Sequence, residues 1–463
     1  MIKLRAIKTV YFIGIGGIGM SAIARFFNEN GVRVLGYDRS ETQLTKELKN
    51  EGIDVQYTTN LEHMPENPDI VVYTPAIANT NILLQYVKEK NFRLFKRSEV
   101  LELISRDMEC VAIAGTHGKT TITTMTAFIL RDSNWGCNAF LGGISANYKT
   151  NFWSDPRNLV VVEADEYDRS FLRLHPDIAI LSAVSADHLD IYGTEDEIEL
   201  AFKAFVEKVN KEGKLIVHQN VPESISSLHQ SVIVYGINAD KRTNINAKDI
   251  RAHQGGFLFT IVDEGEEIKE VFLKMGGYHN VENALAAYAV GKLQGVPRED
   301  IIKALANFKG VKRRYEYIIN ENDYIYIDDY AHHPEELMKL LQGVKQAFPE
   351  KKIKIIFQPH LFSRTKSFYK EFGSSLSIAD EVVLLPIFPA RELPIEGVSS
   401  EMILPYIEKT TIAKVIESQE EIIKTLKFSQ EEILISAGAG DVDKIVDKIR
   451  EKYLNLIGYE EEK

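Results

Sequence analysis

The sequence predicts a three-domain α/β protein, and two observations support this. At 463 residues the chain is too long for one hydrophobic core and suits roughly three domains of about 150 residues each. Short β-branched runs alternate with helical patterns along the chain, which is typical of parallel strands joined by crossover helices.

The composition is that of a globular protein that is not inserted in a membrane. Hydrophobic residues make up 44% of the chain, and no apolar stretch approaches the ~20 residues that a membrane span requires. The start, MIKLRAIKTVYFIGIGGIG, has no signal-peptide pattern, so we expect a cytoplasmic protein. The net charge of −12 without a long basic block argues against a nucleic-acid partner. The only cysteines, Cys110 and Cys137, are expected to be buried structural residues.

The first domain is predicted to span residues 1–107. The pattern indicates strands at 9–13, 32–37 and 70–73 and helices at 20–30 and 81–90. After the first strand, Gly14, Gly16 and Gly19 have the G-x-G-x-x-G spacing of a dinucleotide-binding turn, and Asp38 follows the second strand as its acidic residue. This predicts a Rossmann-like domain with an anion at the helix N-terminus, and it leaves open whether that anion belongs to NAD or to another phosphate ligand.

The second domain, residues 108–310, is predicted to begin with another phosphate loop. A strand from Cys110 to Ala114 leads into AGTHGKTT and then into an amphipathic helix. In such a loop, backbone N–H groups cradle phosphates, the lysine (Lys119) reaches the outer phosphates and the next hydroxyl (Thr120) ligates Mg²⁺. The spacing is not the standard one, because Ile113 stands where the first glycine of that pattern would be. We nevertheless interpret the loop as a nucleoside triphosphate site.

Acidic residues after the next strand are candidates for the metal site. A phosphate loop needs a carboxylate that holds the metal at the end of a neighbouring strand. LVVVEADEYD supplies Glu163, followed by Asp165 and Glu166. In SADHLD, His188 is either a second, less usual Mg²⁺ ligand or a capping or loop histidine.

The rest of the second domain is predicted to contain a strand at 214–218, hairpins over 244–273 and two helices, at 279–295 and 298–308. His279 and Asn283 are four residues apart and therefore share a helix face, where they can contact the base and ribose of a nucleotide. At the junction with the third domain, Arg313 and Arg314 either stabilise a transferring phosphoryl group or are ordinary surface arginines.

The third domain, residues 311–463, is predicted to be a second Rossmann-like open sheet. Strands in YIYIDDY, KIKIIFQPH, EVVLLPIF and EILISAGAG alternate with helices after Pro334, after Ser363, around Glu401 and at the C-terminal end. Polar residues follow two of these strands, where open α/β sheets bind ligands: Asp328, Asp329, Tyr330, His332 and His333 after one, and His360 and Arg364 after the other. Such a group can hold a small carboxylate such as an amino acid; zinc is a weaker alternative, because the spacing fits no common zinc pattern.

Nine separated blocks, spread over all three domains, closely resemble the Mur ligases of bacterial peptidoglycan synthesis. They are GIGGIGMSAIA, AGTHGKTTITTM, EADEYDRSFL, ADHLDIYG, GGYHNVENALAA, KRRYE, DDYAHHPEE, FQPHLFSRT and PIFPARELPIEGVSS. The resemblance implies an ATP-dependent amide ligase that activates the lactyl carboxylate of UDP-N-acetylmuramate as an acyl phosphate. It is nearest to the members that add L-alanine. A recycling ligase that adds the L-alanyl-γ-D-glutamyl-diaminopimelate tripeptide is the alternative, and an NAD-dependent oxidoreductase is a remote one.

The resemblance also implies roles for individual residues. Lys119 would hold the phosphates, Thr120 and Glu163 would ligate one Mg²⁺ ion, and His188 would ligate a second. The residues implied in ATP binding are Gly115, Thr116, His117, Gly118, Lys119, Thr120, Thr121, His279, Asn283 and Arg314. The residues implied in catalysis are Lys119, Glu163, His188 and Arg314. The UDP diphosphate would lie on Gly14, Gly16, Gly17 and Gly19, with Asp38 near the nucleoside. L-alanine would lie among Tyr330, His332, His360 and Arg364.

One residue departs from the family pattern. Some Mur ligases carry a basic residue directly after the histidine of QPH, where this chain has Leu361, so binding of the amino-acid carboxylate is expected to depend more on Arg364. We expect a monomer or a weak homodimer, and closure of the domains around the substrates, because the implied site residues are scattered over all three domains.

Overall fold

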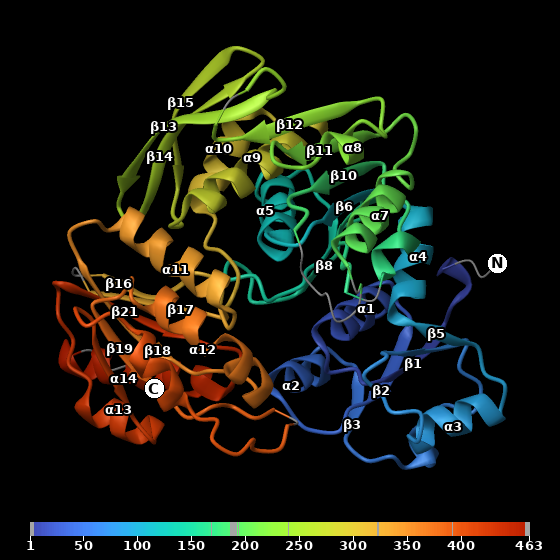
Figure 1. Ribbon diagram of the computed structural model, residues 1–463. Coiled ribbons are helices and arrows are strands. Elements are labelled where there is room, and N and C mark those ends of the chain that lie inside the picture. Colours follow the sequence, from blue (N-terminus) through green and yellow to red (C-terminus); the bar gives the residue numbers. More distant parts are fainter. Residues whose placement is uncertain are drawn as a thin grey trace. The chain divides into compact units, whose positions relative to one another are not determined.

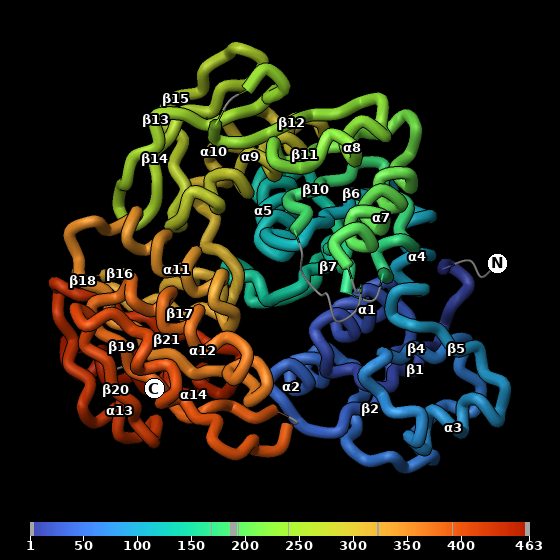
Figure 2. Tube along the Cα trace, in the orientation of Figure 1, coloured from blue at the N-terminus to red at the C-terminus, as the bar shows by residue number. Residues whose placement is uncertain are grey.

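A computed structural model describes residues 4–458 except Asp168, residues 186–191, Gly193, Ala239, residues 322–323 and Arg391. Its strands form sheets of five, ten and six strands, so the expected three-domain α/β architecture is confirmed (Figures 1 and 2). The chain divides into two compact units. The first unit comprises Met1–Lys248, Thr260–Val271 and Glu282–Phe308, and the second unit comprises Asp249–Phe259, Phe272–Val281 and Lys309–Lys463.

The first sheet is parallel throughout and has the order β3-β2-β1-β4-β5. Its strands are β1 (Thr9–Ile13), β2 (Arg33–Tyr37), β3 (Asp54–Gln56), β4 (Ile70–Tyr73) and β5 (Leu94–Lys96), and its helices are α1 (Ile18–Glu29), α2 (Gln43–Asn50), α3 (Ile82–Glu89) and α4 (Arg97–Asp107). Successive side chains of β1 enter two different clusters, because a strand points alternate residues to opposite faces. Val10 and Phe12 pack with α1, whereas Tyr11 and Ile13 pack with α3.

The second sheet has the order β15-β14-β13-β12-β11-β10-β6-β9-β7-β8, and its middle strands are parallel. Its strands are β6 (Glu109–Ala114), β7 (Asn138–Phe140), β8 (Phe152–Trp153), β9 (Leu159–Glu163), β10 (Ile178–Leu181), β11 (Lys214–His218), β12 (Val232–Gly236), β13 (Ile245–His253), β14 (Gly256–Asp263) and β15 (Glu266–Leu273). The accompanying helices are α5 (Lys119–Asp132), α7 (Glu195–Val206), α8 (Glu223–Ser226), α9 (Tyr278–Leu293) and α10 (Arg298–Asn307). The expected hairpin strands β13 to β15 join this sheet through β12, which pairs parallel to β13.

The first two sheets share one hydrophobic core within the first unit. Val10 and Phe12 of β1 belong to the same buried cluster as Phe140 of β7 and Val160 of β9. Figure 1 shows α1 and α4 between the two sheets, where α1 contacts β7 and β8 and α4 contacts β6. Helix α1 therefore serves both sheets.

The third sheet has the order β16-β17-β21-β18-β19-β20, and only β16 is antiparallel to its neighbour. Its strands are β16 (Glu316–Glu321), β17 (Tyr324–Asp329), β18 (Lys352–Phe357), β19 (Glu381–Leu384), β20 (Ile412–Val415) and β21 (Glu432–Ala437), and its helices are α11 (Pro334–Ala347), α12 (Phe362–Leu376), α13 (Gln419–Thr425) and α14 (Lys444–Leu456). The helix expected around Glu401 is instead a 3-10 helix, η4 (Ser400–Tyr406). It contains Pro405, which lacks the N–H that an α-helical turn would use.

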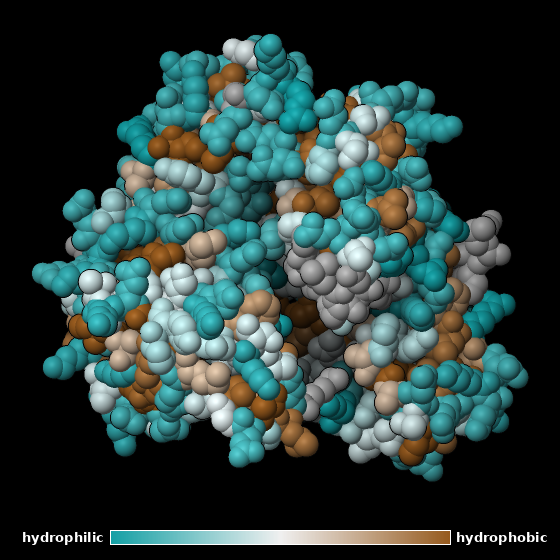
Figure 3. Space-filling model, in the orientation of Figure 1, coloured by the Kyte–Doolittle hydropathy of each residue, from teal (hydrophilic) through white to brown (hydrophobic). Residues whose placement is uncertain are grey.

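Cys110 and Cys137 are buried free thiols, as expected, and burial raises the pKa of both. None of the helices within the described ranges combines the length and the apolar character that a membrane crossing requires. The face in Figure 3 is mostly hydrophilic, with small, scattered groups of apolar side chains. Scattered apolar residues of this kind are ordinary on protein surfaces.

Candidate active site

The second phosphate loop stands between β6 and α5 in the first unit. Gly115 and Gly118 have φ angles of +131° and +81°, which glycine adopts without strain. A Cβ at Gly115 would overlap Ser182 Oγ and lie 2.8 Å from the backbone nitrogen of Ala183, so only glycine fits there. The Thr116 N–H donates to Ala183 O at 3.0 Å, which fixes the loop to the segment after β10. The N-terminus of α5 is thereby presented for an anion.

Lys119, the first residue of α5, is held inside this loop. Its Nζ donates to Gly115 O and to Glu166 Oε1, both at 2.8 Å. Glu166 is only 1% exposed; burial raises the pKa of its carboxyl, and the charge of Lys119 opposes that rise. Sequence reasoning offered Glu166 as support for the metal ligand, whereas the structure pairs it with the lysine.

Glu163 lies beside the phosphate loop, as the strand pattern suggested. It ends β9, which pairs parallel to β6 and places Glu163 opposite Ile113. Its Oε2 is buried and has no hydrogen-bond partner within the described part of the chain. Gly142 leaves the space for this oxygen, since a Cβ at that position would overlap it. A buried carboxylate oxygen without a partner is unfavourable, and a bound cation would satisfy it.

The residues present fit a Mg²⁺ ion of the kind that keeps several waters and phosphate oxygens as ligands. Thr120, in the first turn of α5, and Glu163 can each provide one oxygen. No group of three or more His, Cys, Asp or Glu residues that could hold a metal is present among the residues described. The second expected metal ligand, His188, lies outside the described residues.

Asn283 of α9 packs directly against the phosphate loop. It is 8% exposed, and its Oδ1 lies 2.7 Å from the position that a Cβ on Gly118 would take. Asn283 therefore lies beside the phosphate loop, and its contact with a nucleotide stays a prediction. His279, one turn earlier in α9, belongs to the second unit, where its ring packs over the backbone of Gly277.

The glycine turn of the first domain is hydrogen-bonded to Asp38, the acidic residue after the second strand. Gly14 has a φ of +88°, and its N–H donates to Tyr37 O at 2.7 Å. The Gly16 N–H donates to Asp38 Oδ2 at 2.8 Å, and a Cβ at Gly16 would lie only 2.8 Å from the same oxygen. Gly17 then forms the N-cap of α1. Asp38 therefore shapes the glycine turn as well as standing beside it.

Four expected residues of the third domain form one cluster at the carboxyl ends of β17 and β18. The ring centroids of Tyr330 and His332 are 5.2 Å apart, and those of His332 and His360 are 5.9 Å apart. Arg364 Nη1 lies 3.3 Å from His360 Nδ1. The carboxyl end of an open sheet is where a small ligand is expected to bind.

The cluster carries the positive charge of Arg364 and the carboxylate of Glu336, whose Oε2 lies 3.3 Å from His332 Nδ1. Burial, together with the charge of Arg364, lowers the pKa of His360 to about 4, and burial also lowers the pKa of His332. Both imidazoles are therefore neutral at pH 7, while the guanidinium stays charged. Glu336 lies on the His332 side of the cluster, so Arg364 beside His360 is the group that suits a small carboxylate ligand.

Two buried or strained residues shape the backbone around the cluster. Asp329 accepts hydrogen bonds from the N–H groups of Tyr315 and Ala331, each at 2.7 Å. Burial raises the pKa of its carboxyl to about 6, although these hydrogen bonds and the charge of Arg314 act to lower it. Leu361 has a φ of +71°, a conformation that is strained for a residue with a side chain. Its N–H donates to Phe388 O at 2.9 Å.

The two arginines at the start of the third domain differ in their surroundings. Arg313 is fixed by Nε to Asp328 Oδ2 at 3.1 Å and by Nη2 to Gly438 O at 2.6 Å. Arg314 is exposed. The fixed guanidinium of Arg313 stabilises the domain, and Arg314 is the one whose side chain is accessible to a ligand.

Sequence reasoning missed the partner of Lys119. Glu166 lies 47 residues further along the chain, and no local pattern links the two positions. The parallel pairing of β6 with β9 brings them together. Only the topology of the sheet could have predicted the ion pair.

Comparisons with known proteins cover nearly the whole chain. Three domain families match successive parts of the chain. They are described as "Mur ligase family, catalytic domain" over residues 9–108, "Mur ligase middle domain" over 113–291 and "Mur ligase, glutamate ligase domain" over 313–440. The UDP-N-acetylmuramate–L-alanine ligase of Christiangramia forsetii is 42% identical over 461 residues, covering 98% of this chain and 100% of the relative. The enzyme of the same name from Cytophaga hutchinsonii is 42% identical over 459 residues, 97% of each chain.

Solved structures agree with the sequence comparison. The UDP-N-acetylmuramate-alanine ligase of Thermotoga maritima matches with a TM-score of 0.82 at 29% identity, over 97% of this chain and 99% of that one. A murein peptide ligase from Psychrobacter arcticus matches with a TM-score of 0.64 at 24% identity, over 96% and 98%. The similarity therefore extends over all three sheets.

Proposed function

The chain belongs to the Mur ligase family, and from this premise we propose that it joins L-alanine to the lactyl carboxylate of UDP-N-acetylmuramate while ATP is converted to ADP and phosphate. The observation that carries this is the 42% identity to L-alanine ligases over nearly the full length of the chain. The ligase of murein peptides is less similar in both sequence and structure, so the tripeptide is not favoured as substrate. The product is a precursor of peptidoglycan.

We assign one ligand to each domain. Residues 1–107 hold the UDP-sugar, residues 108–310 hold ATP, and residues 311–463 hold the amino acid. Because the substrates are nucleotides and a free amino acid, we propose that the protein works in the cytoplasm, as a monomer or a weak homodimer.

The first step brings two anions together. An oxygen of the lactyl carboxylate attacks the γ-phosphorus of ATP, the bond to the bridging oxygen breaks, and ADP leaves with that electron pair. Lys119 and the N-terminus of α5 supply positive potential where the phosphates meet. Mg²⁺ held by Thr120 and Glu163, and by His188 at a second position, would neutralise further phosphate charge.

In this proposal, Lys119 gains phosphate oxygens as partners when ATP binds. In the structure its ammonium group is paired with the buried carboxylate of Glu166 at 2.8 Å. We propose that phosphate oxygens share or replace this contact. Because Glu166 is fixed in the protein, it keeps the lysine inside the loop when no nucleotide is present, so ATP finds the lysine already oriented.

The second step uses the cluster of the third domain. The neutral amine of L-alanine attacks the acyl carbon, the carbon–oxygen bond to the phosphate breaks, and phosphate leaves with that electron pair. The proton that the new amide nitrogen loses passes to the departing phosphate or to water. We propose that Arg364 binds the carboxylate of L-alanine while Tyr330, His332 and His360 surround its short side chain. The neutral imidazoles do not repel the amino group.

The turn at Gly14, Gly16, Gly17 and Gly19 binds the diphosphate of the UDP-sugar at the N-terminus of α1. A UDP-sugar diphosphate and an NAD pyrophosphate present the same kind of anion to such a turn, which explains the resemblance to dehydrogenases. Arg314, His279 and Asn283 complete the ATP site in this proposal.

An isotope experiment tests the acyl phosphate directly. UDP-N-acetylmuramate labelled with ¹⁸O in both carboxylate oxygens is incubated with ATP, Mg²⁺ and L-alanine, and the released phosphate is analysed by mass spectrometry. One labelled oxygen should pass to the phosphate and one should stay in the amide. Unlabelled phosphate would contradict activation through an acyl phosphate.

A further inference from the structure

A buried asparagine of the central domain binds the first turn of α1. Asn151 is 0% exposed, and its Nδ2 donates to Ile18 O at 2.6 Å and to Ser21 Oγ at 2.9 Å. Its Oδ1 accepts a hydrogen bond from Arg25 Nη1. An asparagine amide has two N–H donors and one oxygen acceptor, so all of its polar groups are used on this one helix.

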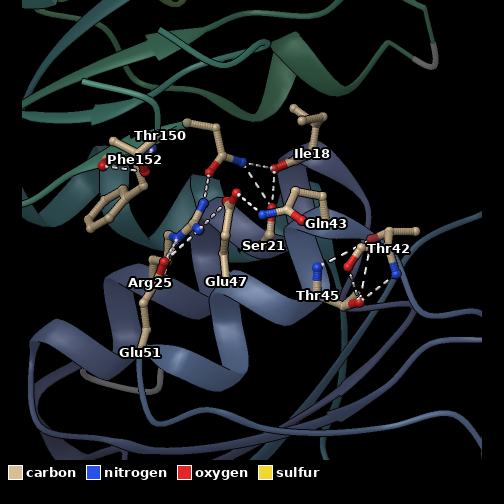
Figure 4. A network of polar contacts seen from close by, with 11 residues as sticks. Ile18, Ser21, Arg25, Thr42, Gln43, Thr45, Glu47, Glu51, Thr150 and Phe152 are labelled. Atoms are coloured by element: carbon tan, nitrogen blue, oxygen red, sulfur yellow. Dashed lines mark hydrogen bonds and ion pairs between the residues drawn. The ribbon is translucent and has the colours of Figure 1, made fainter. Parts of the chain in front are cut away.

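On its other side, the buried guanidinium of Arg25 is paired with partly exposed carboxylates. Figure 4 shows Arg25 of α1 reaching towards Glu47 of α2 and towards Glu51, the residue that follows this helix. Arg25 is 4% exposed, and its Nε and Nη2 bind Glu51 at 2.8 and 2.6 Å, with Glu47 Oε2 at 3.5 Å. A guanidinium held by two carboxylates has little freedom to turn.

Aromatic packing lies beside this polar network. The ring of Phe26 in α1 lies 5.6 Å from that of Phe140 in β7 and 6.1 Å from that of Phe152 in β8. These contacts hold α1 against the edge of the second sheet. The hydrogen bonds of Asn151 add directional contacts to the first turn of the same helix.

Asn151 also ends the segment that passes the proposed metal ligand. Residues 141–151 connect β7 with β8, and the Leu141 N–H donates to Asn151 O at 3.0 Å, which closes the segment at its base. Gly142, near its start, leaves the space for Glu163 Oε2. One short segment therefore contacts the carboxylate beside the phosphate loop and the first turn of the helix that follows the glycine turn.

We propose that Asn151 is a positioning residue that sets the diphosphate-binding turn of the first domain at the distance from the phosphate loop that phosphoryl transfer requires. The inference rests on the proposed function. UDP-N-acetylmuramate is held at one turn and ATP at the other, so the two reacting groups meet only if the turns are correctly spaced. A displacement of about 1 Å can lower the rate of such a reaction by roughly a hundredfold.

Asn151→Asp is the most informative variant. It keeps the side-chain shape and an oxygen for Arg25, but it replaces the amide that donates to Ile18 O and Ser21 Oγ with a carboxylate oxygen that Ile18 O would repel. Asn30→Ala is the matched control, because Asn30 Nδ2 donates to Phe26 O at 2.7 Å at the other end of the same helix. Each substitution removes a hydrogen bond from a side-chain amide to a backbone carbonyl of α1, but only the bond of Asn151 links α1 to the second sheet.

The assay separates binding from turnover in the full-length protein. We expect Asn151→Asp to lower kcat about tenfold or more, while the Kd of UDP-N-acetylmuramate by calorimetry and the KM of ATP stay within threefold of wild type. Asn30→Ala should leave all three unchanged. Ser21→Ala, which removes only one acceptor, should lower kcat by a smaller factor in the same pattern and serves if Asn151→Asp does not fold.

Two results would overturn the inference. One is a kcat of Asn151→Asp equal to that of Asn30→Ala. If Asn151→Asp does not fold, the same result for Ser21→Ala would overturn the inference. The other is a parallel loss of binding for both nucleotides, which is the behaviour of general destabilisation. The wild-type protein in the same assay separates this from the proposed function. No wild-type turnover with L-alanine would refute the function, whereas wild-type turnover together with an unchanged kcat of Asn151→Asp would refute only the positioning role.

Discussion

The ion pair of Lys119 with Glu166 gives a prediction that separates folding from turnover. Replacing Lys119 with Met leaves the carboxylate of Glu166, whose side chain is 2% exposed, without its cation. Breaking a buried ion pair from one side costs about 3–5 kcal/mol, and the Lys119 side chain is itself 14% exposed. We therefore expect Lys119→Met to lower the free energy of unfolding by about 3 kcal/mol at pH 8.

The cost should depend on pH with a defined sign. Burial already raises the pKa of Glu166, and loss of the lysine charge raises it further. A carboxyl whose pKa is higher in the folded than in the unfolded state destabilises the fold as pH rises through that range. The cost of Lys119→Met should therefore be smaller at pH 5 than at pH 8.

A second substitution completes the test. Glu166→Gln in the Lys119→Met background removes the buried charge, so most of the lost stability should return. Formation of ADP should not return, because the lysine is still absent. Trp135 and Trp153 are the only tryptophans and both lie in the first unit, so their fluorescence during urea unfolding reports on the unit that holds the pair. A Lys119→Met protein as stable as wild type at pH 8, or a double variant no more stable than the single one, would refute this reasoning.

Three further predictions concern individual side chains. Glu163→Gln should lower ADP formation at least about a hundredfold and weaken its dependence on Mg²⁺ in a metal titration, without lowering the midpoint of unfolding, because the buried Oε2 has no protein partner among the described residues. The third domain should lose stability as the pH falls from about 6.5 towards 4. The pKa of His360 is lowered to about 4 in the folded protein, so the imidazole takes up a proton on unfolding in this pH range. Circular dichroism at pH 4.5 and 7 should therefore show His360→Gln to be less sensitive to acid. Arg313→Lys cannot reach Asp328 and Gly438 together and should destabilise the same domain by about 2 kcal/mol, which calorimetry can measure; an unchanged transition would mean that these contacts add nothing.

Much of the architecture could be predicted because its signals are local. β1 and β4 occupy the predicted residues, since an apolar run bounded by turns marks a buried parallel strand. The strands that were missed are short or partly exposed: β8 has two residues, and β20 alternates exposed with half-buried positions. Their pairing depends on neighbours distant in sequence, which a pattern along the chain cannot reveal.

The residues of the candidate site also fall into those that a local sequence pattern predicts and those that only the fold brings together. The glycines and lysine of the phosphate loop lie within a few residues, so their spacing predicts their chemistry. Asn151 meets Arg25 across 126 residues of chain, and no sequence pattern marks either residue. Such long-range contacts arise only when two domains pack together, and a sequence without its fold does not specify them.

The most direct test of the account is phosphate release with Mg²⁺, ATP and UDP-N-acetylmuramate, measured in parallel with L-alanine, with the L-alanyl-γ-D-glutamyl-diaminopimelate tripeptide and without an amine. We predict rapid release with L-alanine and only background release in the other two reactions. Preferential release with the tripeptide would contradict the assignment of L-alanine as substrate, and equal release without an amine would contradict the assignment as a ligase.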